Sequence, residues 1–182
     1  MDDIARELGV SKKTLYQFVS NKTDLIQKTF ECEESMMQAW VAEVFTSGMN
    51  AIDELLAFSQ RLNKDFDKFK PEITFSLQKY YPGLYSKVLE SKKKMVYSNI
   101  IQNIEKGIEQ GLYRSDLDVD LVAALYIQKV IGLHSTDLDY LENLTFDKIF
   151  EVMFENHIRG IANQKGTAYF EQQKEKIKNG KN

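Results

Sequence analysis

The sequence predicts an all-α protein of about nine helices. Apolar residues recur at helical spacing in almost every segment, and no segment alternates cleanly between apolar and polar residues as a half-buried strand would. The 182-residue chain contains only two prolines and nine glycines, so long uninterrupted helices are easy to build. Hydrophobic residues make up 43 % of the chain, which is enough to form a core.

Three helices are expected at the start of the chain. The first covers residues 2–8 and ends before Gly9. Ser11 is a good N-cap for a second short helix, and Asn21 caps a long third helix over residues 22–45. These short and long helices follow one another without a flexible linker.

Further helices are predicted by apolar periodicity and by capping residues. Pro71 suits the first turn of a helix, and Pro82-Gly83 marks a break before the next one. Gly111 suits a C-terminal stop, and Asp118 suits an N-cap. The expected spans are 50–69, a short helix from 71, a long helix from 83 to 110, 119–136 and 146–163. The remainder, from Gln164, is polar and rich in lysine, so we expect it to fray.

The turn around Gly9 has the features of a helix-turn-helix. Gly9 can adopt the positive φ of a tight turn, Val10 can fill the corner, and the small Ala5 permits a close crossing. In this motif the second helix enters the DNA major groove with its N-terminal end, which here reads Ser-Lys-Lys-Thr. Short helices joined by a glycine turn also occur in proteins that bind no DNA, and surface lysines are often only solvated. From the spacing alone, both readings stay open.

The segment MDDIARELGVSKKTLYQFVSNKTDLI closely resembles the DNA-binding segment of the tetracycline-repressor (TetR/AcrR) family of bacterial regulators. The matching residues are Ile4, Ala5, Gly9, Val10, Ser11, Thr14, Tyr16, Lys22 and Leu25. One departure is local, because Gln17-Phe18-Val19 stands where the family often has an aromatic pair.

The resemblance implies a role for each polar residue of this segment. Ser11, Lys12, Lys13 and Thr14 would face base edges or phosphates, and Tyr16 and Gln17 would reach the backbone or a base. Lys22 would meet a phosphate at the start of the long helix. The implied partner is double-stranded DNA with an inverted repeat. The residues expected in the core of this segment are Ile4, Ala5, Leu8, Val10, Leu15 and Phe18.

The start of the chain departs from the family pattern. Members normally carry another helix before the point where Met1 stands, and it packs across the helix-turn-helix. Exposing a few apolar side chains could cost on the order of 5 kcal/mol, so we expect a start that was assigned late or shortened.

The last two predicted helices are candidates for a dimer interface. Residues 121–133 and 146–161 are apolar on more than one stripe, as in helices buried on two sides. They could be internal to one chain, but the resemblance implies a homodimer through a four-helix bundle. The expected interface residues are Leu125, Ile149, Phe150, Met153 and His157.

Residues 30–110 are rich in large aromatic side chains, which by themselves indicate core. The resemblance implies a ligand pocket here for an apolar or amphipathic small-molecule effector. The residues expected to line it are Trp40, Phe58, Phe75 and Tyr97. The expected organisation is then a DNA-binding head at 1–46, a ligand-binding and dimerisation domain at 47–165, and a polar tail at 166–182.

No catalytic or metal-binding pattern is evident. His134 and His157 lie on separate helices without a Glu three residues earlier, and phosphate-loop, Cys-x-x-Cys and nucleophile-elbow motifs are absent. We therefore expect no enzyme, no cofactor and no metal. The single Cys32 and the lack of a long apolar run or leader indicate a cytoplasmic protein without membrane association. The alternative is a helical small-molecule-binding or adaptor protein whose DNA-binding head has decayed.

Overall fold

The computed structural model describes residues 1–65, 71–135 and 146–179, with side chains at 1–61, 73–132 and 148–179. These residues form nine helices and no strand, which confirms the all-α prediction. The helices are α1 (Asp2–Glu7), α2 (Lys12–Phe18), α3 (Lys22–Thr46), α4 (Ala51–Asp65), α5 (Pro71–Tyr80), α6 (Pro82–Glu109), α7 (Val119–Ser135), α8 (Phe146–Ile161) and α9 (Gln164–Asn179).

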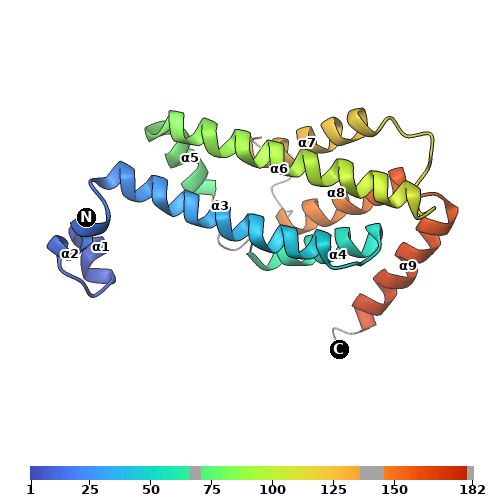
Figure 1. Cartoon of the computed structure of the whole chain (residues 1–182), viewed down its shortest axis with the longest axis horizontal. Coiled ribbons are helices and arrows are strands. Elements are labelled where there is room, and N and C mark those ends of the chain that lie inside the picture. The colour runs from blue at the N-terminus through green and yellow to red at the C-terminus, as the bar shows by residue number, and fades with distance from the viewer. Residues whose placement is uncertain (66–70, 136–145, 180–182) are drawn as a thin grey trace.

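The chain divides into a small head at one end and a larger body (Figure 1). The head consists of α1, α2 and the first turns of α3, and the body contains the rest of α3 with α4–α9. Helix α3 has 25 residues, so at 1.5 Å per residue it spans about 37 Å. It leads from the head into the body, where it lies against α4 and α6. The position of the head therefore depends on how α3 is held.

The body is built around α6, which packs against α3, α4, α5 and α7. Its core is a continuous cluster contributed by α4, α6–α9 and the turn between α6 and α7. The side chains in this cluster that are less than 2 % exposed include Ile52, Leu55, Ile104, Ile158 and Phe170. Burial on this scale is the main source of stability in the fold.

A buried polar network joins α4 to α6. The carboxylate of Glu54 pairs with the Lys106 ammonium at 2.5 Å and accepts a hydrogen bond from Asn103 Nδ2 at 3.1 Å. Asn103 Nδ2 also donates to the Ala51 carbonyl at 2.8 Å, and its Oδ1 accepts from the Tyr113 hydroxyl at 3.1 Å. Burial, together with the charge of Glu54, raises the pKa of Tyr113. Because each polar group has a partner, the network fixes α4 on α6 without leaving a charge unpaired.

The expectation that the chain frays from Gln164 is wrong over Gln164–Asn179, because these residues form α9, an ordered part of the body, while 180–182 lie outside the described residues. Asn163 caps this helix by accepting a hydrogen bond from the Gly166 N–H at 3.0 Å. Phe170 is only 1 % exposed in the main core, and the Tyr169 hydroxyl donates to Asp53 at 2.6 Å. The high lysine content of this segment led us to expect fraying. Tyr169 and Phe170 nevertheless hold the helix against the body.

The remaining helix predictions agree with the structure to within a few residues. The predicted span 50–69 is a helix over Ala51–Asp65, while 66–70 and 136 lie outside the described residues. Asp118 caps α7 as expected, by accepting a hydrogen bond from the Leu121 N–H at 3.0 Å. Within the described parts of the chain, no helix is long and apolar enough to cross a membrane.

Candidate nucleic-acid interface

The turn between α1 and α2 has the conformation that the sequence predicts. Gly9 has φ +66°, in the left-handed region that favours glycine. The Gly9 N–H donates to the Arg6 carbonyl at 3.1 Å, and the Val10 N–H donates to the Ala5 carbonyl at 3.0 Å. These bonds close the end of α1 and direct the chain into α2.

Ser11 begins α2 as its N-cap. Its Oγ accepts a hydrogen bond from the Thr14 N–H at 3.0 Å and lies 2.7 Å from Thr14 Oγ1. The two hydroxyls therefore already bond to each other. Their main effect is to fix the first turn of α2, which leaves contacts beyond the head to the longer side chains.

Four exposed polar side chains follow on α2. Lys12 and Tyr16 stand one turn apart, as do Lys13 and Gln17, so the four form two adjacent stripes on the helix surface. Lys22 is also exposed, at the first position of α3. The structure thus gathers two ammonium groups, a phenol and an amide on one short helix, with a third ammonium group at the start of the next.

Asp2 is a neighbour of this surface that sequence reasoning missed. Its carboxylate lies 2.9 Å from Lys12 Nζ. The hydrogen bond and charge of Lys12 lower the pKa of Asp2, and Asp2 in turn raises the pKa of Lys12. Both side chains are exposed, so the pair is weak and can exchange for other charges. Ten residues separate them, and only the crossing of α1 and α2 brings them together.

A second turn fixes α2 relative to α3. Asn21 Oδ1 accepts from the Asp24 N–H at 3.0 Å, and the Asp24 carboxylate accepts from the Ser20 N–H at 2.7 Å. This backbone hydrogen bond is the main reason that the pKa of Asp24 is lowered. Lys28 Nζ then reaches back from α3 to the Phe18 carbonyl at 2.7 Å. Lys28, which the sequence did not single out, ties the C-terminal end of α2 to α3.

The core of the head differs from the prediction. Ala5, Leu15 and Val19 are buried, with Ile4 partly buried against them. Three further residues expected there are exposed instead, namely Leu8 (61 %), Val10 (39 %) and Phe18 (70 %). Leu8 stays in helical phase with Ile4, because its N–H donates to the Ile4 carbonyl at 3.0 Å, but its side chain lies at the uncovered end of α1. Val19 turns inward because the chain becomes extended there, and this leaves Phe18 outside.

The residues predicted to form a dimer interface differ in how far they are exposed on the single chain. The assignment of Phe150 is wrong, because its side chain is 4 % exposed inside the core of its own chain, next to Phe154. Ile149 and Met153 are partly buried. Leu125 is 55 % exposed on α7. Other exposed apolar residues on α7 and α8, which the sequence did not single out, are Leu121 and Val152.

His157 faces the inside of its own chain. Its ring lies 4.1 Å from the Tyr126 ring, centroid to centroid, and its Nε2 is buried without a hydrogen-bond partner. Burial, with a smaller effect of the Lys129 charge, lowers the pKa of His157 to about 4. His157, which is partly exposed, therefore packs α8 against α7 within one chain, and its place in an interface between two chains stays a prediction.

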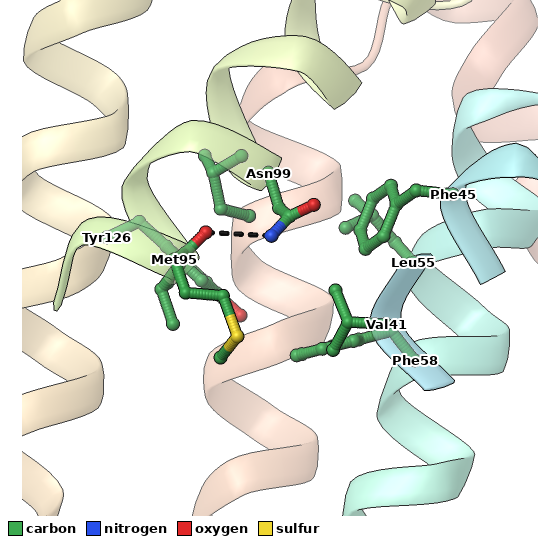
Figure 2. Close-up of a pocket in the computed structure, with 9 residues that line it drawn as sticks. Val41, Phe45, Leu55, Phe58, Met95, Asn99 and Tyr126 are labelled. Carbon is green, nitrogen blue, oxygen red and sulfur yellow. Dashed lines mark hydrogen bonds between the residues drawn. The ribbon is translucent and has the colours of Figure 1, made fainter. Parts of the chain in front are cut away.

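A small cavity lies between α3, α4, α6 and α7 (Figure 2). It measures about 20 Å³, which is room for about one water molecule. Its wall is almost entirely apolar and includes Val41, Phe45 and Met95. The amide of Asn99 lies among these side chains, with its Nδ2 bonded to the Met95 carbonyl at 2.8 Å.

Of the residues predicted to line a pocket, Phe58 lines this cavity. Trp40 stands behind Phe58, with ring centroids 5.3 Å apart. The Tyr97 hydroxyl points to Asp120 at 2.8 Å, and Phe75 is 62 % exposed on α5. Of the four predicted residues, Phe58 alone lines this cavity, and a ligand site here stays a prediction. Helical phase within a tertiary fold decides which ring faces inward.

Groups of three or more His, Cys, Asp or Glu that could hold a metal are not found among the residues that the structure describes. Cys32 is exposed on α3, and the side chain of His134 lies outside the described residues.

Comparison with known proteins identifies the fold. No protein-family model and no curated protein sequence matches the chain. Solved structures do match, each over 90 % of this chain. NemR from E. coli in its reduced form is 16 % identical, with a TM-score of 0.67 over 86 % of that chain. A transcriptional regulator from Cytophaga hutchinsonii is 17 % identical, with a TM-score of 0.69 over 88 %. A TetR-family regulator from the same organism is 18 % identical, with a TM-score of 0.65 over 84 %. The chain therefore has the fold of TetR-family transcriptional regulators, and the resemblance in the sequence is confirmed for the fold.

Proposed function

We propose that this chain is a DNA-binding transcriptional regulator that reads an inverted repeat as a homodimer. The observation that carries the proposal is the surface of α2, where Lys12, Lys13, Tyr16 and Gln17 are exposed side by side on a capped helix. Lysines supply charge for phosphates, and the phenol and the amide supply directional hydrogen bonds. Lys22 adds a further cation at the start of α3. Such a regulator would work in the cytoplasm, where bacterial DNA is found.

Dimerisation is supported by exposed apolar side chains on α7 and α8. Leu121 and Leu125 on α7, and Val152 on α8, are each about half exposed in the single chain. A second copy related by a two-fold axis would cover them and place two α2 helices for two half-sites. Leu125→Glu should then shift the chain from dimer to monomer in sedimentation. Phe75→Glu, an equally exposed site on α5, is the control that should leave the dimer intact.

An effector is supported by the cavity between α3, α4, α6 and α7. Its apolar wall and the Asn99 amide suit an apolar or amphipathic molecule. With a volume of about 20 Å³, the cavity holds no such molecule unless its walls move apart. Since Val41 and Phe45 belong to α3, binding would displace the helix that carries the head. This gives the effector the differential affinity for two positions of α3 that regulation requires.

The alternative is a helical small-molecule-binding or adaptor protein whose head no longer reads DNA. The exposure of Leu8 and Phe18 beside a very small head core favours this alternative. Against it stands the set of exposed polar residues on α2, for which an unused head has no need.

The deciding experiment is a selection of binding sequences from random duplex DNA by the purified chain. Recovery of an inverted repeat, with half-sites about one helical turn apart, would support the regulator. If the folded protein enriches no sequence, the adaptor becomes the better description.

A further inference from the structure

Helices α3 and α6 run alongside each other in the same direction and share one seam (Figure 1). Deep in the body this seam is apolar, and it forms the wall of the cavity with Val41 and Phe45 from α3 and Met95 from α6. Nearer the head the seam becomes polar. There Glu34 of α3 meets Ser91 of α6, and the charges of Glu33 and Glu34 act on Lys92 of α6.

The polar part of the seam is a connected set of contacts. Ser91 Oγ donates a hydrogen bond to the Glu34 carboxylate, and Gln38 Nε2 donates to the same carboxylate at 3.2 Å. The Lys92 side chain is half-buried between the helices. Burial lowers the pKa of Lys92, while the charges of Glu33 and Glu34 oppose that shift. The two carboxylates thus compensate an ammonium group that has lost part of its water.

The location of these contacts gives them a mechanical role. Glu34 precedes Val41 by two helical turns on α3, and Ser91 precedes Met95 by about one turn on α6. The polar contact therefore lies on the same seam as the cavity, between the cavity and the head. From this contact, α3 continues to the head (Figure 1).

We propose that Glu34, Ser91 and Lys92 form a latch that holds α3 on α6 and thereby sets the orientation of the head relative to the body. The part of this inference that concerns an effector rests on the proposed function. A molecule that enters the cavity must separate α3 from α6, and the latch is the next contact along the seam to open.

The chemistry of the latch suits a contact that opens and closes. Its groups lie at the edge of the body, so water can replace each lost hydrogen bond when the helices part. An apolar contact of the same area would lack that compensation and would resist opening. Two discrete positions of α3, closed and open, are the bistable element that coupling between distant sites requires.

The test measures the orientation of the head directly. Spin labels on Glu7→Cys in α1 and Glu109→Cys in α6, both at exposed positions, report the head-to-body distance in a Cys32→Ser background. Labelled chain is diluted with unlabelled chain, so that distances within one subunit dominate. The latch variants are Glu34→Gln, Ser91→Ala and Lys92→Met. The matched controls are Glu31→Gln, about one turn before Glu34 on α3, and Lys93→Met, next to Lys92 on α6. Both side chains are exposed.

The latch variants should broaden the distance distribution, while both controls keep the narrow one. On the DNA recovered by selection, the latch variants should also bind about fivefold more weakly, because the head is no longer held in one orientation. An unchanged distribution in Ser91→Ala and Lys92→Met would overturn the latch. If Lys92→Met fails to fold, as circular dichroism would reveal, Ser91→Ala decides the matter.

Failure of the latch and failure of the proposed function have different signatures. If the chain selects no DNA but the latch variants broaden the distance distribution, the latch is supported and the proposed regulator function is contradicted. If the chain selects an inverted repeat but the distance distribution is unchanged in every variant, the latch is contradicted and the regulator function is supported.

Discussion

The head buries three side chains in its own small cluster, whereas the body buries fifteen in one continuous core, counted over the described residues. The polar contacts differ in the same way. In the head, Asp2 and Lys12 pair on the surface, while in the body Glu54 is buried with Lys106 and Asn103. The head therefore contributes little to stability and keeps its polar side chains available. The body supplies most of the stability, and substitutions of its buried side chains should lower the free energy of unfolding.

The largest effect on stability should come from a phenylalanine of the body, and a phenylalanine of the head gives the comparison. Phe170→Ala removes a ring that is 1 % exposed in the body core, and it should lower the free energy of unfolding by about 3–5 kcal/mol. Phe18→Ala removes a ring that is 70 % exposed in the head, so its effect should stay within about 0.5 kcal/mol. Urea unfolding measures both. Equal losses would mean that the head is as tightly packed as the body.

The partly buried His157, whose Nε2 is shielded from water, should make the body sensitive to acid. Its pKa is about 4 in the fold against an ordinary 6.5, so the unfolded chain binds a proton between these values and the folded chain does not. Its contribution is complete above pH 6.5 and is lost as the pH falls toward 4. We expect the free energy of unfolding to be about 2 kcal/mol lower at pH 5 than at pH 7 from this group.

The control for that prediction is His157→Phe, which keeps a ring against Tyr126 and removes the titrating group. The drop between pH 7 and pH 5 should shrink by the amount that His157 contributes. The same drop in both proteins would show that His157 is accessible to water in solution.

Lysines of the two regions should differ in their effect on DNA binding. Lys12→Ala with Lys13→Ala removes two cations from α2, so binding should weaken by about tenfold or more, and the dependence of log Kd on log salt should become less steep by about 1.8 per subunit. Lys93→Ala with Lys94→Ala removes the same charge from the surface of α6. Titrations at several salt concentrations separate the pairs. If log Kd depends on log salt with the same slope in both variants, α2 does not form the DNA interface.

The smallest effect should come from Asp2. Asp2→Asn releases Lys12 from its ion pair and removes a negative charge near the proposed DNA surface. We expect DNA binding to tighten by about two- to threefold at low salt, with the difference fading at high salt. Asp3→Asn, which removes the same charge from a residue that pairs with Arg6, is the control. Weaker binding by Asp2→Asn would show that Asp2 orients Lys12 and does not compete for it.

Local patterns predicted most of the fold. Apolar periodicity gave the helices, and Ser11, Asn21 and Asp118 cap the helices that they were expected to cap. Gly9 has the positive φ of the expected turn. These features depend on residues within a few positions of one another, so a single sequence is sufficient to find them. The exposed residues of α2 follow from the same local phase.

Features that depend on distant residues were missed. No local pattern places Asp2 beside Lys12, or Tyr169 of α9 against Asp53 of α4. It also assigned Phe150 to a surface between two chains, because an apolar helix shows two buried sides without showing which partner covers each.

Local sequence patterns were thus sufficient for the helices, their caps, the turn at Gly9 and the polar side chains on α2. Helix packing was needed to show which rings line the cavity, that α9 joins the body core, and that Glu34 lies near Ser91 and Lys92 beside the cavity. These two sets of features depend on interactions of different range along the chain. Helical propensity and capping act over a few residues, whereas the partner of a side chain is fixed by how whole helices cross, and that crossing is set by the packing of the entire core.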